Sequence, residues 1–172
     1  MTSHLVFTVI AHDRPGLVDR LAEAIADVGG NWVESSMARL GGEFAGIVRV
    51  QIDEASLADL HQRFDALLAD GIAITLRVDA RSGDRVTGKA AHLDLVSQDH
   101  PGVLRQITKV LRDRNVSIVQ LETMVEAGSM SGEAMFKAAA DLHLPEGLEP
   151  LDLSEALQEI AADMMADIKL ID

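Results

Sequence analysis

Asp13-Arg14-Pro15-Gly16-Leu17-Val18 and Asp99-His100-Pro101-Gly102-Val103-Leu104 are two copies of one short sequence motif. Each copy follows an apolar run that is typical of a strand and precedes a run with helical periodicity. Shifting the chain so that Asp13 falls on Asp99 also superposes Asp27 on Asp113 and Val33 on Val119. A repeat over this distance predicts two copies of one supersecondary unit.

The apolar periodicity predicts the same six elements in each half of the chain. Leu17, Leu21 and Ile25 recur at the spacing of a helix with one buried face. Gly41-Gly42 separates two strand-like runs and indicates a hairpin turn. The expected elements of the first half are a strand at 5–10, a helix at 15–28, strands at 31–40 and 43–52, a helix at 57–68 and a strand at 72–78. Those of the second half are a strand around 93–95, a helix at 103–111, strands at 116–125 and 133–142, a helix at 153–164 and a strand at 168–170.

The order βαββαβ, found twice, predicts an α+β protein made of two ferredoxin-like sandwiches in tandem. The expected domains are residues 1–80 and 90–172. Residues 81–89 are polar and contain two glycines, which is typical of a linker. The exposed sheet edges of such small units favour association, and we expect a homodimer.

Composition narrows the possible functions. The 172 residues carry a formal net charge of −13, with 6 basic and 12 acidic residues in 1–80 and 9 and 16 in 81–172. Because phosphate contacts require a basic face, direct binding to nucleic acid or to an anionic membrane is disfavoured. The sequence has no cysteine and shows neither a signal peptide nor a membrane span, so the expected location is the cytoplasm.

The repeated turn is the first candidate site. Proline suits the first turn of a helix, glycine permits close approach of a ligand, and the preceding aspartate is able to cap the free N–H groups. The same N–H groups and the helix dipole favour a bound carboxylate, while Asp13 or Asp99 would meet an ammonium group. The alternative is that both turns only begin helices.

Asn31 is the second candidate, because it opens a strand near the end of the first helix and offers two donors and an acceptor. It is equally suited to a turn. Ser117 occupies its place in the second half, so the two copies are not expected to bind one ligand equally.

No catalytic or metal-binding pattern emerges from the sequence. None of the six histidines has a second histidine at the spacing of a helical metal site such as H-E-x-x-H. The sequence also has no phosphate-binding loop and no dinucleotide fingerprint. We therefore expect no catalysis, no metal and no cofactor.

The two βαββαβ units, each with an Asp-x-Pro-Gly turn, resemble tandem ACT domains. The stretches Ala11–Val18 and Gly30–Phe44 look like the first domain of the glycine cleavage system transcriptional repressor family. In ACT domains, amino acids bind at the first strand–helix loop and the start of the second strand, usually at a domain interface. This resemblance implies a ligand site formed by Asp13, Arg14, Pro15, Gly16 and Asn31, and by Asp99, His100, Gly102 and Ser117 in the second copy.

The resemblance implies a regulatory protein that senses an amino acid such as glycine and acts through a partner transcription factor. Two alternatives stay open at this point. One is an interaction module that has no metabolite ligand. The other is a regulatory subunit of an enzyme of amino-acid or folate metabolism, because ACT domains accompany such enzymes.

Overall fold

The computed structural model describes residues 1–78, 87–130 and 132–172. The chain divides into two units, Met1–Asp84 and Arg85–Asp172. The elements of the first unit are β1 (Thr2–His12), α1 (Leu17–Ala26), β2 (Asn31–Leu40), β3 (Glu43–Asp53), a short 3-10 turn η1 (Glu54–Ser56), α2 (Leu57–Ala69) and β4 (Ala73–Val78). Those of the second are β5 (Lys89–Gln98), α3 (Val103–Asp113), β6 (Ser117–Ala127), β7 (Ala134–Leu144), α4 (Pro150–Met164) and β8 (Asp167–Ile171).

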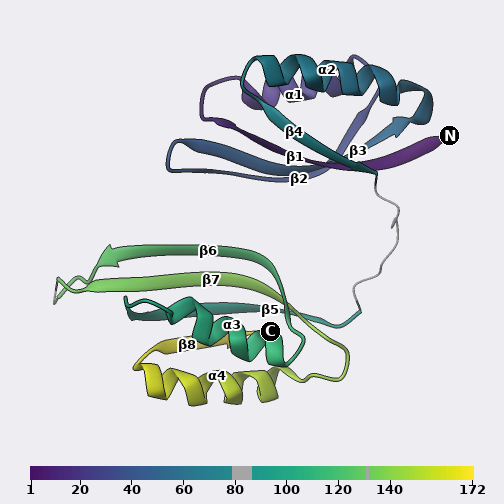
Figure 1. Ribbon diagram of the computed structural model, residues 1–172. Helices are drawn as coiled ribbons and strands as arrows, with labels where there is room; N and C mark the ends of the chain where they lie inside the picture. Colours follow the sequence, from purple (N-terminus) through teal and green to yellow (C-terminus); the bar gives the residue numbers. More distant parts are fainter. Residues whose placement is uncertain (79–86, 131) are drawn as a thin grey trace. The chain divides into compact units, whose positions relative to one another are not determined.

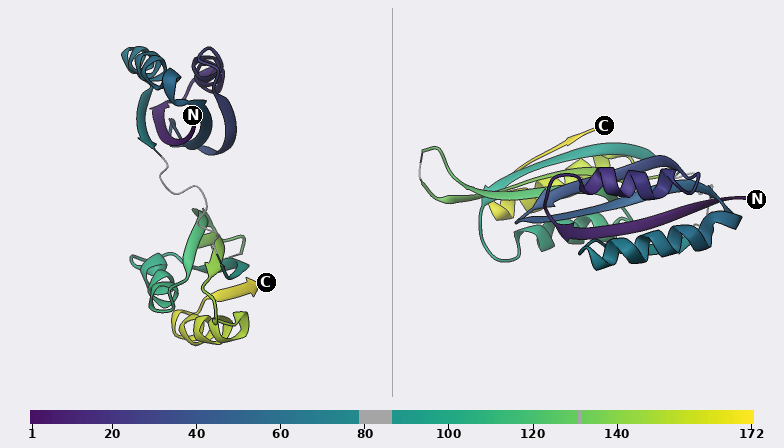
Figure 2. Two further views of the ribbon diagram at one scale, coloured as in Figure 1. Left: turned by 90° about the vertical axis from the view of Figure 1, so that its right-hand side faces the viewer. Right: turned by 90° about the horizontal axis from the view of Figure 1, so that it is seen from above.

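The first unit is an antiparallel sheet in the order β2-β3-β1-β4, with both helices on one face (Figures 1 and 2). Alternate residues of β1 point toward the helices, because successive side chains of a strand point to opposite faces. Leu5, Phe7 and Val9 are accordingly buried. Leu21 and Ile25 of α1 cover them with the predicted helical period. The rings of Phe7 and Phe64 meet edge to face with centroids 5.0 Å apart.

The second unit repeats this arrangement with the sheet order β6-β7-β5-β8 and helices α3 and α4 on one face (Figure 1). Its core is aliphatic and centres on Leu93, Leu95, Ile107 and Leu153. The two units also share a local irregularity. The β2–β3 register shifts between Trp32 and Glu34, and the β6–β7 register shifts at the corresponding place, between Ile118 and Gln120.

The predicted fold is confirmed: two four-stranded antiparallel sheets, each with two helices, have the order βαββαβ. The element bounds differ in places. The first helix begins at Leu17 and ends at Ala26, inside the predicted 15–28, and β7 extends to Leu144. Of the predicted linker 81–89, residues 81–86 lie outside the described part of the chain, and Lys89 already belongs to β5.

No helix in the described ranges is long and apolar enough to span a bilayer.

Candidate functional site

The loop from Asp13 to Gly16 lies at the hairpin end of the first sheet. The backbone N–H of Asp13 donates to the carbonyl of Gly42, in the β2–β3 turn, at 2.9 Å. The second unit has the same anchor, in which the N–H of Asp99 donates to the carbonyl of Ala134 at 2.8 Å. In both units a backbone hydrogen bond thus links the repeated motif to the start of the third strand.

Gly16 and Gly102 are the N-cap residues of α1 and α3. Both have left-handed backbone conformations, with φ of 89° and 91°. A Cβ at either glycine would meet no atom within 4 Å, so the backbone dihedral and not close approach requires glycine in these positions. Among the described residues, no protein atom makes the predicted close approach at these glycines, and close approach of a ligand stays a prediction.

The prediction that Asp13 and Asp99 cap the helices is wrong. Neither α1 nor α3 has a side-chain cap. Because the N-cap residue itself is glycine, each aspartate stands three residues too early to reach the second or third helical N–H. Pro15 likewise precedes the N-cap and does not lie in the first helical turn. Within the described part of the chain, no side chain accepts a hydrogen bond from the first N–H groups of α1.

Asp13 instead forms an ion pair with Arg39 near the end of β2. Arg39 Nη1 lies 3.1 Å from Asp13 Oδ2, and the side chains are 71% and 29% exposed. Sequence reasoning missed Arg39. The available signal was its position two residues before the Gly41-Gly42 turn, which places it at the hairpin end of the sheet. An anion, a cation and free helical N–H groups therefore gather at this loop.

Arg14 is directed to the end of α2. Its guanidinium donates to the carbonyl of Asp70 at 2.8 Å. Arg20 forms an ion pair with the Asp70 carboxylate, and this hydrogen bond and charge hold the pKa of Asp70 below 3.8. Positive charge at a helix C-terminus is favourable, so Arg14 has a structural role beside the one predicted for it.

Asn31 lies at the other end of the sheet. It pairs with Gln51, whereas the loop at Asp13 follows the pairing of His12 with Glu43. At about 3.3 Å per residue, the eight steps along β2 from Asn31 to Arg39 span roughly 25 Å. Ser117 pairs with His143 and is separated from Asp99 in the same way. Within a unit, the structure therefore does not bring the two predicted parts of the ligand site together.

The second unit lacks the ion pair of the first. Among the described residues, the side chain of Asp99 has no hydrogen-bonding or ionic partner, and Val125 occupies the position of Arg39. His100 Nδ1 lies 3.1 Å from the carbonyl of Pro101 and thus bonds locally. Asn115, with φ of 55°, ends α3 in the left-handed conformation that Gly29 adopts after α1. The two loops share a backbone shape and differ in charge.

Comparison with known proteins agrees with this architecture. Residues 3–78 match the family model of the ACT domain. A search of curated proteins found no match.

Two solved structures cover nearly the whole chain. A protein of unknown function from Galdieria sulphuraria is 26% identical, with a TM-score of 0.87 over 99% of this chain and 98% of its own. A proposed glycine cleavage system transcriptional repressor is 18% identical, with a TM-score of 0.75 over 99% of this chain and 96% of its own. The second likeness shows a shared fold, and both extend over the two units.

Proposed function

We propose that this chain is a non-catalytic regulatory protein that senses an amino acid, because residues 3–78 match the family model of the ACT domain and the second unit repeats the fold of the first. The sensing site is the β1–α1 loop of the first unit. The observation that carries the proposal is the Asp13–Arg39 ion pair beside the uncapped N-terminus of α1.

The chemistry of this loop suits a zwitterion. The ligand carboxylate takes the Arg39 guanidinium and the first N–H groups of α1, where the helix dipole favours an anion. The ligand ammonium forms an ion pair with the Asp13 carboxylate. Because the Arg39 side chain is 71% exposed, water screens its pair with Asp13, which contributes about 0–1 kcal/mol to folding, and a ligand is able to replace it at little cost.

Asn31 joins this site only across an interface. β2 is an edge strand, and nine of its residues follow Asn31 along an open side of the sheet. An antiparallel pairing of two β2 edges about a twofold axis between Ser35 and Ser36 places Asn31 of one copy opposite Leu40 of the other. Because Leu40 adjoins Arg39, this homodimer completes the site that the sequence predicted, and it also covers the free edge.

We further infer that regulation acts on transcription through a partner protein, as in a glycine cleavage system repressor. Both halves carry a net negative charge, which disfavours the phosphate contacts that direct DNA binding requires. This charge supports action through a partner protein. Glycine is the first ligand to test, since the likeness to a proposed glycine cleavage system repressor extends over the full chain. A cytoplasmic location belongs to the same proposal.

The experiment is thermal unfolding of the pure protein against a panel of the amino acids. A ligand at a hundred times its dissociation constant stabilises the folded state by about 2.7 kcal/mol, which raises the midpoint by roughly 5 °C or more. A shift with one amino acid supports the sensor. No shift with any of them contradicts it and favours an interaction module without a metabolite.

Variants locate the site. Arg39→Gln removes a charged hydrogen bond to the ligand and is expected to weaken binding about tenfold or more. Arg63→Gln is the matched control, because Arg63 forms a comparable exposed ion pair with Asp27, 2.6 Å long, beyond the far end of α1. If the Arg39→Gln and Arg63→Gln variants bind the amino acid with equal affinity, Arg39 does not belong to the site. Asn31→Ala is expected to weaken both binding and dimerisation, which sedimentation reports.

A further inference from the structure

In each sheet, one face carries no helix. The cross-strand rows of residues on these two faces lie at equivalent positions, but their side chains differ in charge and polarity. Three cross-strand rows of the first unit are Val6–Arg49–Glu34, Thr8–Ile47–Ser36 and Ile10–Ala45–Ala38. The rows at the same places in the second unit are His92–Asp141–Gln120, Asp94–Ala139–Glu122 and Val96–Lys137–Met124. The first face therefore carries one ion pair among apolar and small polar side chains, whereas the second face is rich in carboxylates.

A hollow lies over the middle row of the second unit and the neighbouring Val96–Lys137–Met124 row. Its volume is about 340 Å³, and its lining is mostly apolar. Ala139 lies at the centre of the middle row, between Asp94 and Glu122, where the first unit has the larger Ile47. Met124, which is 58% exposed, lines the hollow as well. The hollow thus combines an apolar surface with a carboxylate on either side.

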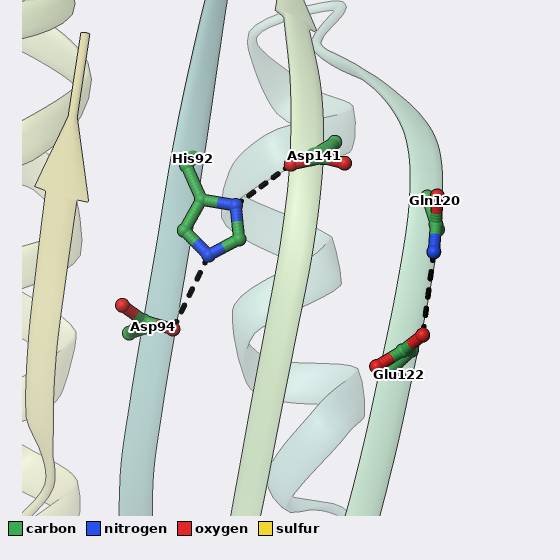
Figure 3. Close-up of polar contacts among 5 residues, drawn as sticks. All are labelled: His92, Asp94, Gln120, Glu122 and Asp141. Atoms are coloured by element: carbon green, nitrogen blue, oxygen red, sulfur yellow. Dashed lines mark hydrogen bonds and ion pairs between the residues drawn. The ribbon is translucent and has the colours of Figure 1, made fainter.

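Neighbouring side chains hold these carboxylates in place without neutralising them fully. Asp94 accepts from His92 Nε2 at 3.3 Å, and Glu122 accepts from Gln120 Nε2 at 3.3 Å (Figure 3). Among the described residues neither forms an ion pair with lysine or arginine. Lys137 also lines the hollow, and its charge is paired with Glu126. In Figure 3, Asp94 and Glu122 lie on opposite sides of β7.

His92 lies between two carboxylates, since its Nδ1 is 2.7 Å from Asp141 Oδ1. The Asp141 hydrogen bond is the main cause of a raised pKa for His92, to which Asp94 adds. The other charged side chain that the sheet register places beside this group is Lys169, opposite Asp94 in β8. Five carboxylates therefore face two lysines and one histidine over this surface (Asp94, Glu122, Glu126, Asp141 and Asp167 against Lys137, Lys169 and His92).

We propose that this hollow is a docking surface for a basic amphipathic segment of a partner protein. An aliphatic lysine or arginine stem lies on Ala139 and Met124, and its cation lies between Asp94 and Glu122. Long basic side chains bury their stems in this way while their charges stay hydrated, and methionine adapts to varied shapes. Complementary charge gives specificity and a faster encounter.

Other occupants fit this surface less well. Nucleic acid has the wrong charge. No group of His, Cys, Asp or Glu in the described ranges has the arrangement that would hold a metal ion. A symmetric contact with the same face of a second copy would bring carboxylates together and cost binding energy. The proposal locates the partner contact of the proposed function, but it requires no amino-acid ligand.

The test uses two synthetic peptides and the full chain labelled with 15N. One peptide alternates lysine with valine, and the other alternates glutamate with valine. At low ionic strength, the lysine peptide is expected to shift amide resonances of β5, β6 and β7 around the hollow, and the glutamate peptide is not. Binding is expected to weaken at high salt, because salt screens exposed charges.

A charge-matched pair of variants makes the test specific. Asp94→Thr with Glu122→Ser installs the residues of the first unit, Thr8 and Ser36, and is expected to weaken peptide binding at least tenfold. Glu155→Gln with Glu159→Gln removes the same charge from the exposed side of α4 and should change it less than twofold. Similar losses in both pairs, or resonance shifts mapping to another surface, would overturn the proposal.

The outcome is separable from that of the amino-acid panel. The Asp94→Thr and Glu122→Ser pair should leave any amino-acid shift unchanged, because the β1–α1 loop belongs to the first unit. If the lysine peptide binds but no amino acid stabilises the protein, the docking surface is supported and the amino-acid sensor is contradicted. If an amino acid stabilises the protein but the lysine peptide does not bind, only the docking surface is contradicted.

Discussion

The left-handed conformation of Gly16 leads to a quantitative prediction about the first unit. With φ of 89° at the N-cap, any L side chain there is strained. A Cβ would meet no atom within 4 Å, so Gly16→Ala adds no clash and isolates the backbone cost. That cost is about 1–2 kcal/mol. Reduced freedom of the unfolded chain offsets part of it, and we expect a net loss of about 1 kcal/mol.

The sole tryptophan makes the measurement selective. The chain has one Trp and no Tyr, and Trp32 packs against the core of the first unit. Urea unfolding followed by Trp32 fluorescence therefore reports that unit. With a slope of about 1 kcal/mol per M, Gly16→Ala should lower the midpoint by about 1 M.

Two controls distinguish strain from other causes. Gly102→Ala introduces the same strain in the second unit and should leave the Trp32 transition unchanged if the units unfold independently. Gly16→Asn should cost less than Gly16→Ala, because asparagine tolerates the left-handed region better. An alanine variant as stable as the wild type, or an asparagine variant less stable than the alanine variant, would show that backbone strain at residue 16 is not what requires glycine.

Further predictions concern the core and the carboxylate face. Phe64→Ala removes the edge-to-face partner of Phe7 and should lower the stability of the first unit by about 3–5 kcal/mol in the same fluorescence assay; a loss below 1 kcal/mol would contradict the packing. The pKa of His92 is raised above 6.5, so the stability it contributes to the second unit is fully present below pH 6.5 and is lost as the pH rises through the raised value. Titration of the His92 ring by NMR should show a midpoint above 6.5 that Asp141→Asn lowers more than Asp94→Asn; a midpoint at or below 6.5 in the wild type would contradict it.

Local patterns were sufficient to predict the fold. The helical period of Leu17, Leu21 and Ile25 marked the buried side of α1, and all three residues are buried. Gly41 and Gly42 form the predicted turn, each with positive φ. The repeated motif predicted the second copy of the unit. These features depend on residues near one another in the chain, where helix and strand periods act directly.

The candidate site was predicted only in part. The sequence pointed to the repeated loop, but it assigned capping to Asp13, because the residue that becomes the N-cap depends on the backbone angles of Gly16. The resemblance to ACT domains grouped Asn31 with Asp13 in one ligand site, usually at a domain interface. The antiparallel register places them at opposite ends of the sheet, and a period of two along each strand does not contain that information.

Two units, the order of their elements and the apolar residues on their buried sides could be predicted from the chain alone, since burial follows short periods. The contacts between distant side chains became known from the folded structure. Arg39 reaches Asp13 because a hairpin returns the chain to the β1–α1 loop. His92 meets Asp141 because β5 and β7 pair in one register out of many. Such contacts depend on strand order and register, which are set by the packing of the whole sheet.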